Sequence, residues 1–196
     1  MPKLLVVSDD ARARDDLVEL LGDDVEVTTP QEAGVERPDD DGSSFTQIAM
    51  DIADKAARAS GLVTVAEASG LIVDVLDGAP GVASAQFAGP NATEADNRAL
   101  LLERVREAGS RSRSARLVSV IGVASPDGEL RTFESTLEGV IATEERGVEG
   151  VAYEPVFELD DGMTIAELLP EDREDANPRM TALADALPFI RELLGR

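Results

Sequence analysis

The side chains that can carry chemistry in this sequence are carboxylates, hydroxyls, arginines and one tyrosine. The 196 residues include no cysteine and no histidine, which excludes disulfide bonds, thiolate nucleophiles, the usual zinc sites and histidine acid–base catalysis. Three polar groups stand out: Ser8-Asp9-Asp10, Asp39-Asp40-Asp41-Gly42 and Glu67-Ala68-Ser69-Gly70. Carboxylate oxygens are hard ligands, so the acidic run 39–42 suits Mg²⁺.

Each of these groups also has a purely structural interpretation. Ser8-Asp9-Asp10 is similar to the acidic pocket of a phosphoacceptor receiver domain, but no lysine follows Lys55 to contact a phosphoryl group. A polar turn that caps a helix also explains the two aspartates. The run 39–42 either chelates a divalent cation or is a solvated acidic loop, and 67–70 either exposes polar groups at a strand end or is a plain turn.

Predicted strands and helices alternate along the chain and position these groups. An apolar run at 4–7 and a helical leucine pattern at 17–21 predict a strand followed by a helix. The sequence predicts further strands at 25–28, 62–66 and 71–76, a hairpin of 115–124 with 130–141, and helices at 45–60, 94–108 and 180–194. The segment 67–70 then forms a turn between two strands. We expect one α/β domain over residues 1–196.

The sequence is strongly acidic. Asp and Glu number 40 against 18 Lys and Arg, which gives a net charge of −22. Such a charge repels phosphate backbones and anionic lipids, so we expect no nucleic-acid partner and no membrane partner. No apolar run approaches the roughly 20 residues that span a bilayer, and the first residues lack a signal-peptide pattern, so we place the protein in the cytoplasm.

The acidic excess predicts that stability depends on salt, as in a halophilic protein. Screening of the repulsion between carboxylates weakens as the Debye length grows from about 3 Å at 1 M salt to about 10 Å at 0.1 M. We therefore expect the melting temperature to fall as KCl is lowered over this range. A melting temperature that does not change with KCl would contradict a salt-adapted surface.

Eight blocks of sequence, in this order, carry a resemblance to one family. They are 42–45, 69–74, 78–89, 92–97, 126–129, 139–141, 153–157 and 166–168. The most distinctive is Gly78-Ala79-Pro80-Gly81 with Asn97 downstream. In these blocks the chain resembles the inosine/xanthosine triphosphate pyrophosphatases, which clear deaminated purine nucleotides.

The resemblance implies a fold, a ligand and a reaction. The fold would be α/β, with a long mixed β-sheet flanked by helices and two lobes around a nucleotide cleft. The protein would be a homodimer that binds Mg²⁺ and a purine nucleotide or related small anion. The reaction would hydrolyse a nucleoside triphosphate to the monophosphate and pyrophosphate, which requires cations around the phosphates and carboxylates that position water.

The resemblance also implies which residues form the site. Glu67 is the catalytic candidate, and the candidate metal ligands are Asp10, Asp40 and Glu67. The candidate substrate-binding residues are Ser8, Ser69, Gly70, Tyr153, Glu154, Arg173 and Arg179.

The chain departs from the family pattern at several polar positions. Ala13 and Ile52 stand where the family has lysines, Ile48 where it has asparagine, and Ala68 where it has aspartate. Ile48 and Ile52 share a helix face with Phe45, so a helix placed as in the family fills phosphate space with alkyl groups.

These departures leave two functions open. The first is a dimeric binding or partner protein whose triphosphate hydrolysis is weak or lost, because two cations and a metal-positioning carboxylate are replaced together. The alternative is an active Mg²⁺-dependent ITP/XTP pyrophosphatase with a rebuilt site. In that alternative Asp10, Asp40 and Glu67 hold Mg²⁺, while Arg173 and Arg179 hold phosphate and base.

Overall fold

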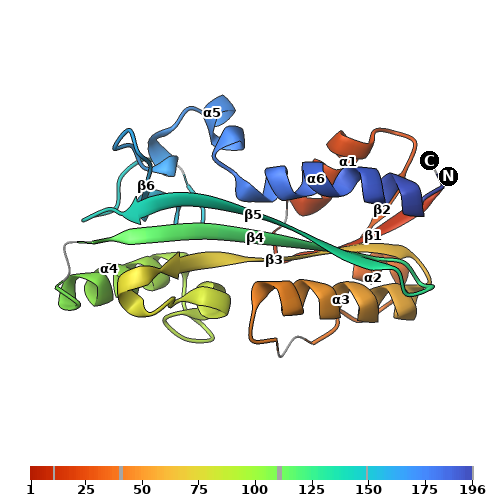
Figure 1. The fold of residues 1–196 in the computed structure, drawn as a ribbon, viewed down its shortest axis with the longest axis horizontal. Coiled ribbons are helices and arrows are strands. Elements are labelled where there is room, and N and C mark those ends of the chain that lie inside the picture. The colour runs from red at the N-terminus through yellow and green to blue at the C-terminus, as the bar shows by residue number, and fades with distance from the viewer. Residues whose placement is uncertain (11, 40–41, 110–111, 149, 196) are drawn as a thin grey trace. The chain divides into compact units, whose positions relative to one another are not determined.

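The structure, a computed structural model, describes residues 1–10, 12–39, 42–109, 112–148 and 150–195 (Figure 1). The strands are β1 (Lys3–Val7), β2 (Glu26–Thr28), β3 (Val63–Val73), β4 (Ser114–Ala124), β5 (Leu130–Ile141) and β6 (Phe157–Glu158). The α-helices are α1 (Ala13–Leu21), α2 (Pro30–Ala33), α3 (Phe45–Ser60), α4 (Glu94–Glu107), α5 (Pro170–Asp175) and α6 (Pro178–Leu193). Short 3₁₀ helices are η1 (Asp74–Leu76), η2 (Gly81–Gln86), η3 (Glu154–Val156) and η4 (Ile165–Glu167).

The strands form one mixed sheet in the order β2-β1-β3-β4-β5-β6. β1 pairs in parallel with both β2 and β3, and β6 pairs antiparallel with β5. Val7, the last residue of β1, lies opposite Ala66 of β3. Residues that follow β1 therefore meet the residue after Ala66 at one place on the sheet. The predicted α/β fold with a mixed sheet flanked by helices is confirmed.

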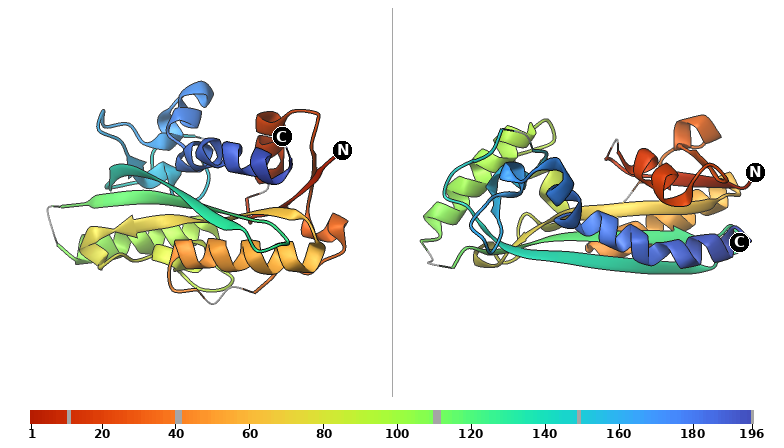
Figure 2. Two further views of the ribbon diagram at one scale, coloured as in Figure 1. Left: turned by 45° about the vertical axis from the view of Figure 1, so that its right-hand side comes forward. Right: turned by 90° about the horizontal axis from the view of Figure 1, so that it is seen from above.

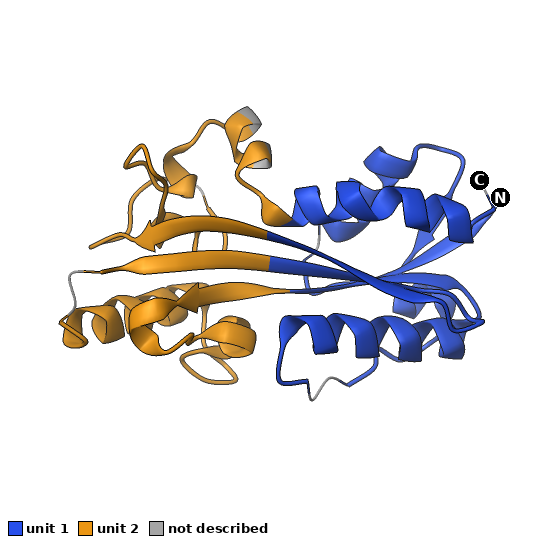
Figure 3. Cartoon of the chain, in the orientation of Figure 1, with its two compact units in different colours: residues 1–68, 119–135, 179–196 blue, residues 69–118, 136–178 orange. Residues whose placement is uncertain are grey.

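The chain divides into two compact units, drawn in different colours in Figure 3. Unit 1 consists of residues 1–68, 119–135 and 179–196, and unit 2 consists of residues 69–118 and 136–178. Strands β3, β4 and β5 each begin in one unit and end in the other. Neither unit is therefore a single unbroken segment of the chain.

The core of unit 1 is built on both faces of its part of the sheet. Leu4 and Val6 of β1 belong to a buried apolar cluster that includes Leu17 of α1 and Ile190 of α6. Alternate side chains of a strand point to opposite faces, so the buried Leu5 and Val7 face the other side, where α3 contacts β1 (Figures 1 and 2). Burial on both faces explains why residues 4–7 form a continuous apolar run.

The core of unit 2 is a second, separate apolar cluster. It joins β3 and α4 to the segment around β6, with Leu71, Leu101, Val105 and Phe157 among its buried residues. Phe157 has no exposed surface. These aliphatic contacts hold the later polar loops of unit 2 in place.

Several sequence predictions about single elements are confirmed. Helix α3 begins after Ser44, whose Oγ accepts a hydrogen bond from the Gln47 N–H at 3.2 Å, and ends at Gly61 in the left-handed conformation. The predicted hairpin is β4 and β5, closed by a bond from the Ser125 N–H to the Glu129 carbonyl. No helix within the described ranges is long and apolar enough to span a membrane.

The predicted turn at 67–70 is wrong, because β3 runs without interruption from Val63 to Val73. Ala66 and Ala68 are buried, whereas Glu67 is partly exposed. A strand with one buried and one open face accommodates such polar residues, so Ser and Gly do not end it.

Candidate functional site

Three of the predicted site residues meet beyond the end of β1. The Ser8 Oγ donates a hydrogen bond to Glu67 Oε2 at 2.7 Å, and the Asp10 backbone N–H donates to the Ser8 Oγ at 3.0 Å. The parallel register of β1 with β3 brings Ser8 beside Glu67. Ser8 therefore orients a carboxylate at the place where the sequence predicts chemistry.

Two arginines hold the carboxylate of Asp10. Arg12 donates from Nε at 3.1 Å and from Nη2 at 2.8 Å, and Arg179 Nη1 lies 3.6 Å from Asp10 Oδ2. Burial raises the pKa of Asp10, but the Arg12 hydrogen bonds and the charge of Arg179 outweigh it, so the pKa lies below its usual value. Asp10 is therefore ionised at neutral pH.

Arg179 is buried in unit 1 and pairs mainly with Asp16. Its Nη2 lies 2.5 Å from Asp16 Oδ2, and the residue is only 5% exposed. Burial raises the pKa of Asp16, against the lowering effect of Arg179 and Arg12. The pair ties the start of α6 to α1. The predicted role of Arg179 in binding substrate remains a prediction.

Sequence reasoning missed a further arginine at this turn. Arg37, in the segment after α2, binds both carboxylate oxygens of Asp9, with Nη2 2.9 Å from Oδ2. These two residues lie 28 positions apart. No local sequence pattern predicts this ion pair, because it forms only when the segment after α2 folds back to the end of β1.

The candidates in unit 2 are held mainly by backbone contacts. Tyr153 is 5% exposed and its hydroxyl donates to the Ser84 carbonyl at 2.7 Å, so its ring packs in the core. Glu154 accepts from the Val151 N–H at 3.0 Å. Arg173 donates to the carbonyls of Ala166 and Leu168. Ser69 and Gly70 lie within β3, and Ser69 is exposed.

Because Tyr153 is buried, we expect its hydroxyl to lose its proton at a higher pH than that of free tyrosine. Burial raises the pKa of Tyr153 to about 12, against a smaller lowering effect of Arg98. Because the folded pKa lies above the unfolded value, this group stabilises the fold below about pH 10 and loses that effect as pH rises towards 12. The chain has one Tyr and no Trp, so tyrosinate absorbance reports this side chain alone. Titration of the native protein with the pKa of free tyrosine would contradict the burial.

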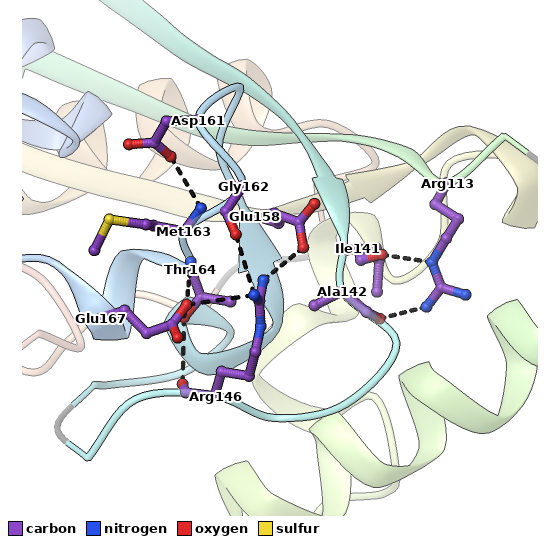
Figure 4. A network of polar contacts seen from close by, with 10 residues as sticks. All are labelled: Arg113, Ile141, Ala142, Arg146, Glu158, Asp161, Gly162, Met163, Thr164 and Glu167. Carbon is purple, nitrogen blue, oxygen red and sulfur yellow. Dashed lines mark hydrogen bonds and ion pairs between the residues drawn. The ribbon is translucent and has the colours of Figure 1, made fainter.

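A second polar network in unit 2 shapes the segment around β6 and η4 (Figure 4). Arg146 contacts Glu158 at 2.5 Å, the Gly162 carbonyl at 3.1 Å and Glu167 at 3.7 Å. Nearby, Arg113 donates to the carbonyls of Ile141 and Ala142. Arg146 thus links β6 to η4 and to the loop between them, and Arg113 binds the end of β5. Sequence reasoning did not identify either residue.

The apolar replacements are ordinary core residues of unit 1. Ala13 is 5% exposed, Ile48 9%, Ile52 0% and Ala68 7%. Ile52 has no exposed surface, and the expectation that it fills ligand space stays a prediction. The apolar face of α3 packs inward, as an amphipathic helix does.

The described residues include two of the three predicted Mg²⁺ ligands. Glu67 and Asp10 are carboxylates linked through Ser8, and their oxygens are the ligands that Mg²⁺ prefers. The third predicted ligand, Asp40, lies outside the described residues. Within the described part of the chain, no three acidic residues form a group that would hold a metal ion. The chemistry of Glu67 and Asp10 fits the ion.

Comparisons with known proteins find similar sequences and structures along nearly the whole chain. The chain is 37% identical to a dITP/XTP pyrophosphatase of Exiguobacterium sibiricum, over 89% of this chain and 88% of that protein. It is 36% identical to a dITP/XTP pyrophosphatase of Nocardia farcinica, over 100% and 98% of the two chains. The structure of a HAM1 protein from Coxiella burnetii superposes with a TM-score of 0.91 at 31% identity, covering 98% of this chain and 100% of that one.

The resemblance to the inosine/xanthosine triphosphate pyrophosphatases is thereby confirmed. The matching family is described as the Ham1 family, and the match extends over residues 4–189. Nearly the whole chain is included, together with every predicted site residue. The chain belongs to the Ham1 family.

Proposed function

We propose that this protein is a Mg²⁺-dependent pyrophosphatase of deaminated purine nucleoside triphosphates. It hydrolyses dITP, ITP or XTP to the monophosphate and pyrophosphate. The observation that carries the proposal is the hydrogen bond from Ser8 to Glu67 beside the parallel strands β1 and β3. The names of the two relatives described above, dITP/XTP pyrophosphatases, support the choice of substrate.

Glu67 has the chemistry that this hydrolysis requires. Its carboxylate is oriented by the Ser8 hydroxyl, and it accepts a proton from the attacking water as the water oxygen bonds to phosphorus. The phosphoanhydride bond between the α and β phosphates breaks, and pyrophosphate leaves with the electron pair. Glu67 and Asp10 would hold Mg²⁺, which neutralises charge on the phosphate oxygens when it is bound.

A second candidate function is a nucleotide-binding protein without turnover. The observation that favours it is the burial of Ala13, Ile52 and Ala68 at positions where the resemblance implies two lysines and an aspartate. Each missing electrostatic contact lowers a rate by about 10²- to 10³-fold in known enzymes. The comparisons favour the active enzyme, because the relatives are named for this activity.

Pyrophosphate release separates the two functions. The protein would be assayed with ITP, dITP and XTP, and with ATP and GTP as reference substrates, in Mg²⁺ and high KCl. We expect release from the three deaminated nucleotides well above that from ATP and GTP. If calorimetry shows that ITP binds but no pyrophosphate is released, the proposed enzymatic function is wrong and the nucleotide-binding function is supported. Light scattering of the same sample would test the proposed homodimer.

A further inference from the structure

Three guanidinium groups surround the turn after β1, in a chain whose net charge is −22. Arg37 binds both oxygens of Asp9, Arg12 binds both oxygens of Asp10, and Arg179 lies 3.6 Å from Asp10. All of these residues belong to unit 1. The Asp10 N–H donates to the Ser8 Oγ and Ser8 donates to Glu67, so this turn adjoins the place of the proposed reaction.

We propose that Arg37 binds the polyphosphate chain of the ligand, and that Asp9 is an internal counter-ion which this chain displaces from Arg37. The inference rests on the proposed function for the place of the reaction. It adds a cation at a position other than the two lysine positions occupied by Ala13 and Ile52, so Arg37 supplies positive charge from another segment of the chain.

The contact between Arg37 and Asp9 has the geometry of phosphate recognition. A guanidinium group presents parallel N–H donors that match two oxygens of a carboxylate or a phosphate. Arg37 uses this arrangement on Asp9. A phosphate group offers the same two oxygens with more negative charge, so it competes for the same donors.

Asp9 can leave Arg37 at small cost. The Asp9 side chain is 81% exposed and the Arg37 side chain 35% exposed. An exposed ion pair contributes little to stability, and the released carboxylate is rehydrated by water. Arg12 is 53% exposed, but its Nε and Nη2 donate to Asp10. Arg179 is 6% exposed and held by Asp16, so we assign both of these arginines to positioning Asp10.

The test is calorimetric binding of sodium tripolyphosphate, pyrophosphate and orthophosphate at one fixed salt concentration. Variant Arg37→Gln should raise the Kd for tripolyphosphate about tenfold, because one charge-assisted contact is lost. Variant Arg37→Lys should show a smaller increase. Arg58→Gln is the matched control, since Arg58 binds both oxygens of Asp54 on α3. Its Kd should stay within about twofold of the unmodified protein.

Substitution of the counter-ion gives the sharper readout. Variant Asp9→Asn should tighten tripolyphosphate binding several-fold, because it removes the carboxylate that competes for Arg37, whereas Asp54→Asn should not. If the Arg37–Asp9 pair only fastens the loop, Asp9→Asn weakens binding or leaves it unchanged. That result would overturn the proposal, as would equal effects of Arg37→Gln and Arg58→Gln or no binding of tripolyphosphate.

The three anions distinguish the possible sources of the phosphate groups. Preference for tripolyphosphate indicates the substrate chain, whereas preference for pyrophosphate places the product there and overturns the assignment to the substrate. Because these probes carry no base and are measured by binding alone, failure of nucleotide hydrolysis would leave a positive result intact. A negative binding result would likewise leave the hydrolysis assay unaffected. Circular dichroism of each variant confirms that it is folded.

Discussion

Replacing Glu67 with glutamine should lower kcat/KM for dITP by about 10²- to 10³-fold, within the range seen when a general base is removed. Glutamine keeps the size of the side chain, and its amide oxygen can still accept the hydrogen bond that Ser8 donates at 2.7 Å. The negative charge and the basic oxygen are lost. Steady-state pyrophosphate release, with circular dichroism to check folding, measures the effect.

The matched control is Glu26→Gln, which neutralises a carboxylate of β2 paired with Lys3 at 2.8 Å. This pair is exposed, so we expect a change of less than about twofold in kcat/KM. If Glu67→Gln hydrolyses dITP as fast as Glu26→Gln does, Glu67 is not the base and the assignment of the site is wrong.

Replacing Gly122 with alanine should lower the free energy of unfolding by about 3 kcal/mol. Gly122 lies in β4, and a Cβ there would overlap the Ala49 carbonyl of α3, with the carbonyl carbon at 2.7 Å. The atoms in the way belong to the backbone of α3, which cannot change rotamer as a side chain can, so the whole helix must move away from the sheet. The melting temperature should fall by about 10 °C for a chain of this length.

Gly61→Ala is the control for the cost of a glycine substitution itself. Gly61 ends α3 with a φ of +69°, and a Cβ there meets no heavy atom within 4 Å. We expect about 1 kcal/mol from the left-handed backbone alone. Calorimetric melting of the two variants that shows equal losses would contradict the close approach of α3 to β4.

The regular parts of the fold were predictable because their signals are local. The apolar run at 4–7, the limits of α3 at Ser44 and Gly61, and the hairpin of β4 and β5 all follow from nearby residues. The turn expected at 67–70 failed because Ser and Gly indicate a turn only when no neighbouring strand pairs with them. β3 pairs with β1 only from Val63 to Ala66, but β4 is its other neighbour in the sheet, and β3 continues to Val73.

The candidate site was predictable only where residues lie in, or directly after, neighbouring strands. Ser8, Asp10 and Glu67 meet as expected, because β1 and β3 are parallel neighbours. The contact between Arg37 and Asp9 was not predictable, because it joins distant positions through a loop. Arg179 and Asp16 come from opposite ends of the chain, and no spacing rule relates them.

The most direct test of the account is a single turnover of dITP. The unmodified protein, in excess over dITP and with Mg²⁺ and high KCl, would be followed by phosphorus NMR. We predict that all of the dITP becomes dIMP and pyrophosphate in equal amounts, with no orthophosphate. Intact dITP that stays bound would contradict the proposed hydrolysis and support the nucleotide-binding protein instead. Orthophosphate as the first product would contradict cleavage between the α and β phosphates.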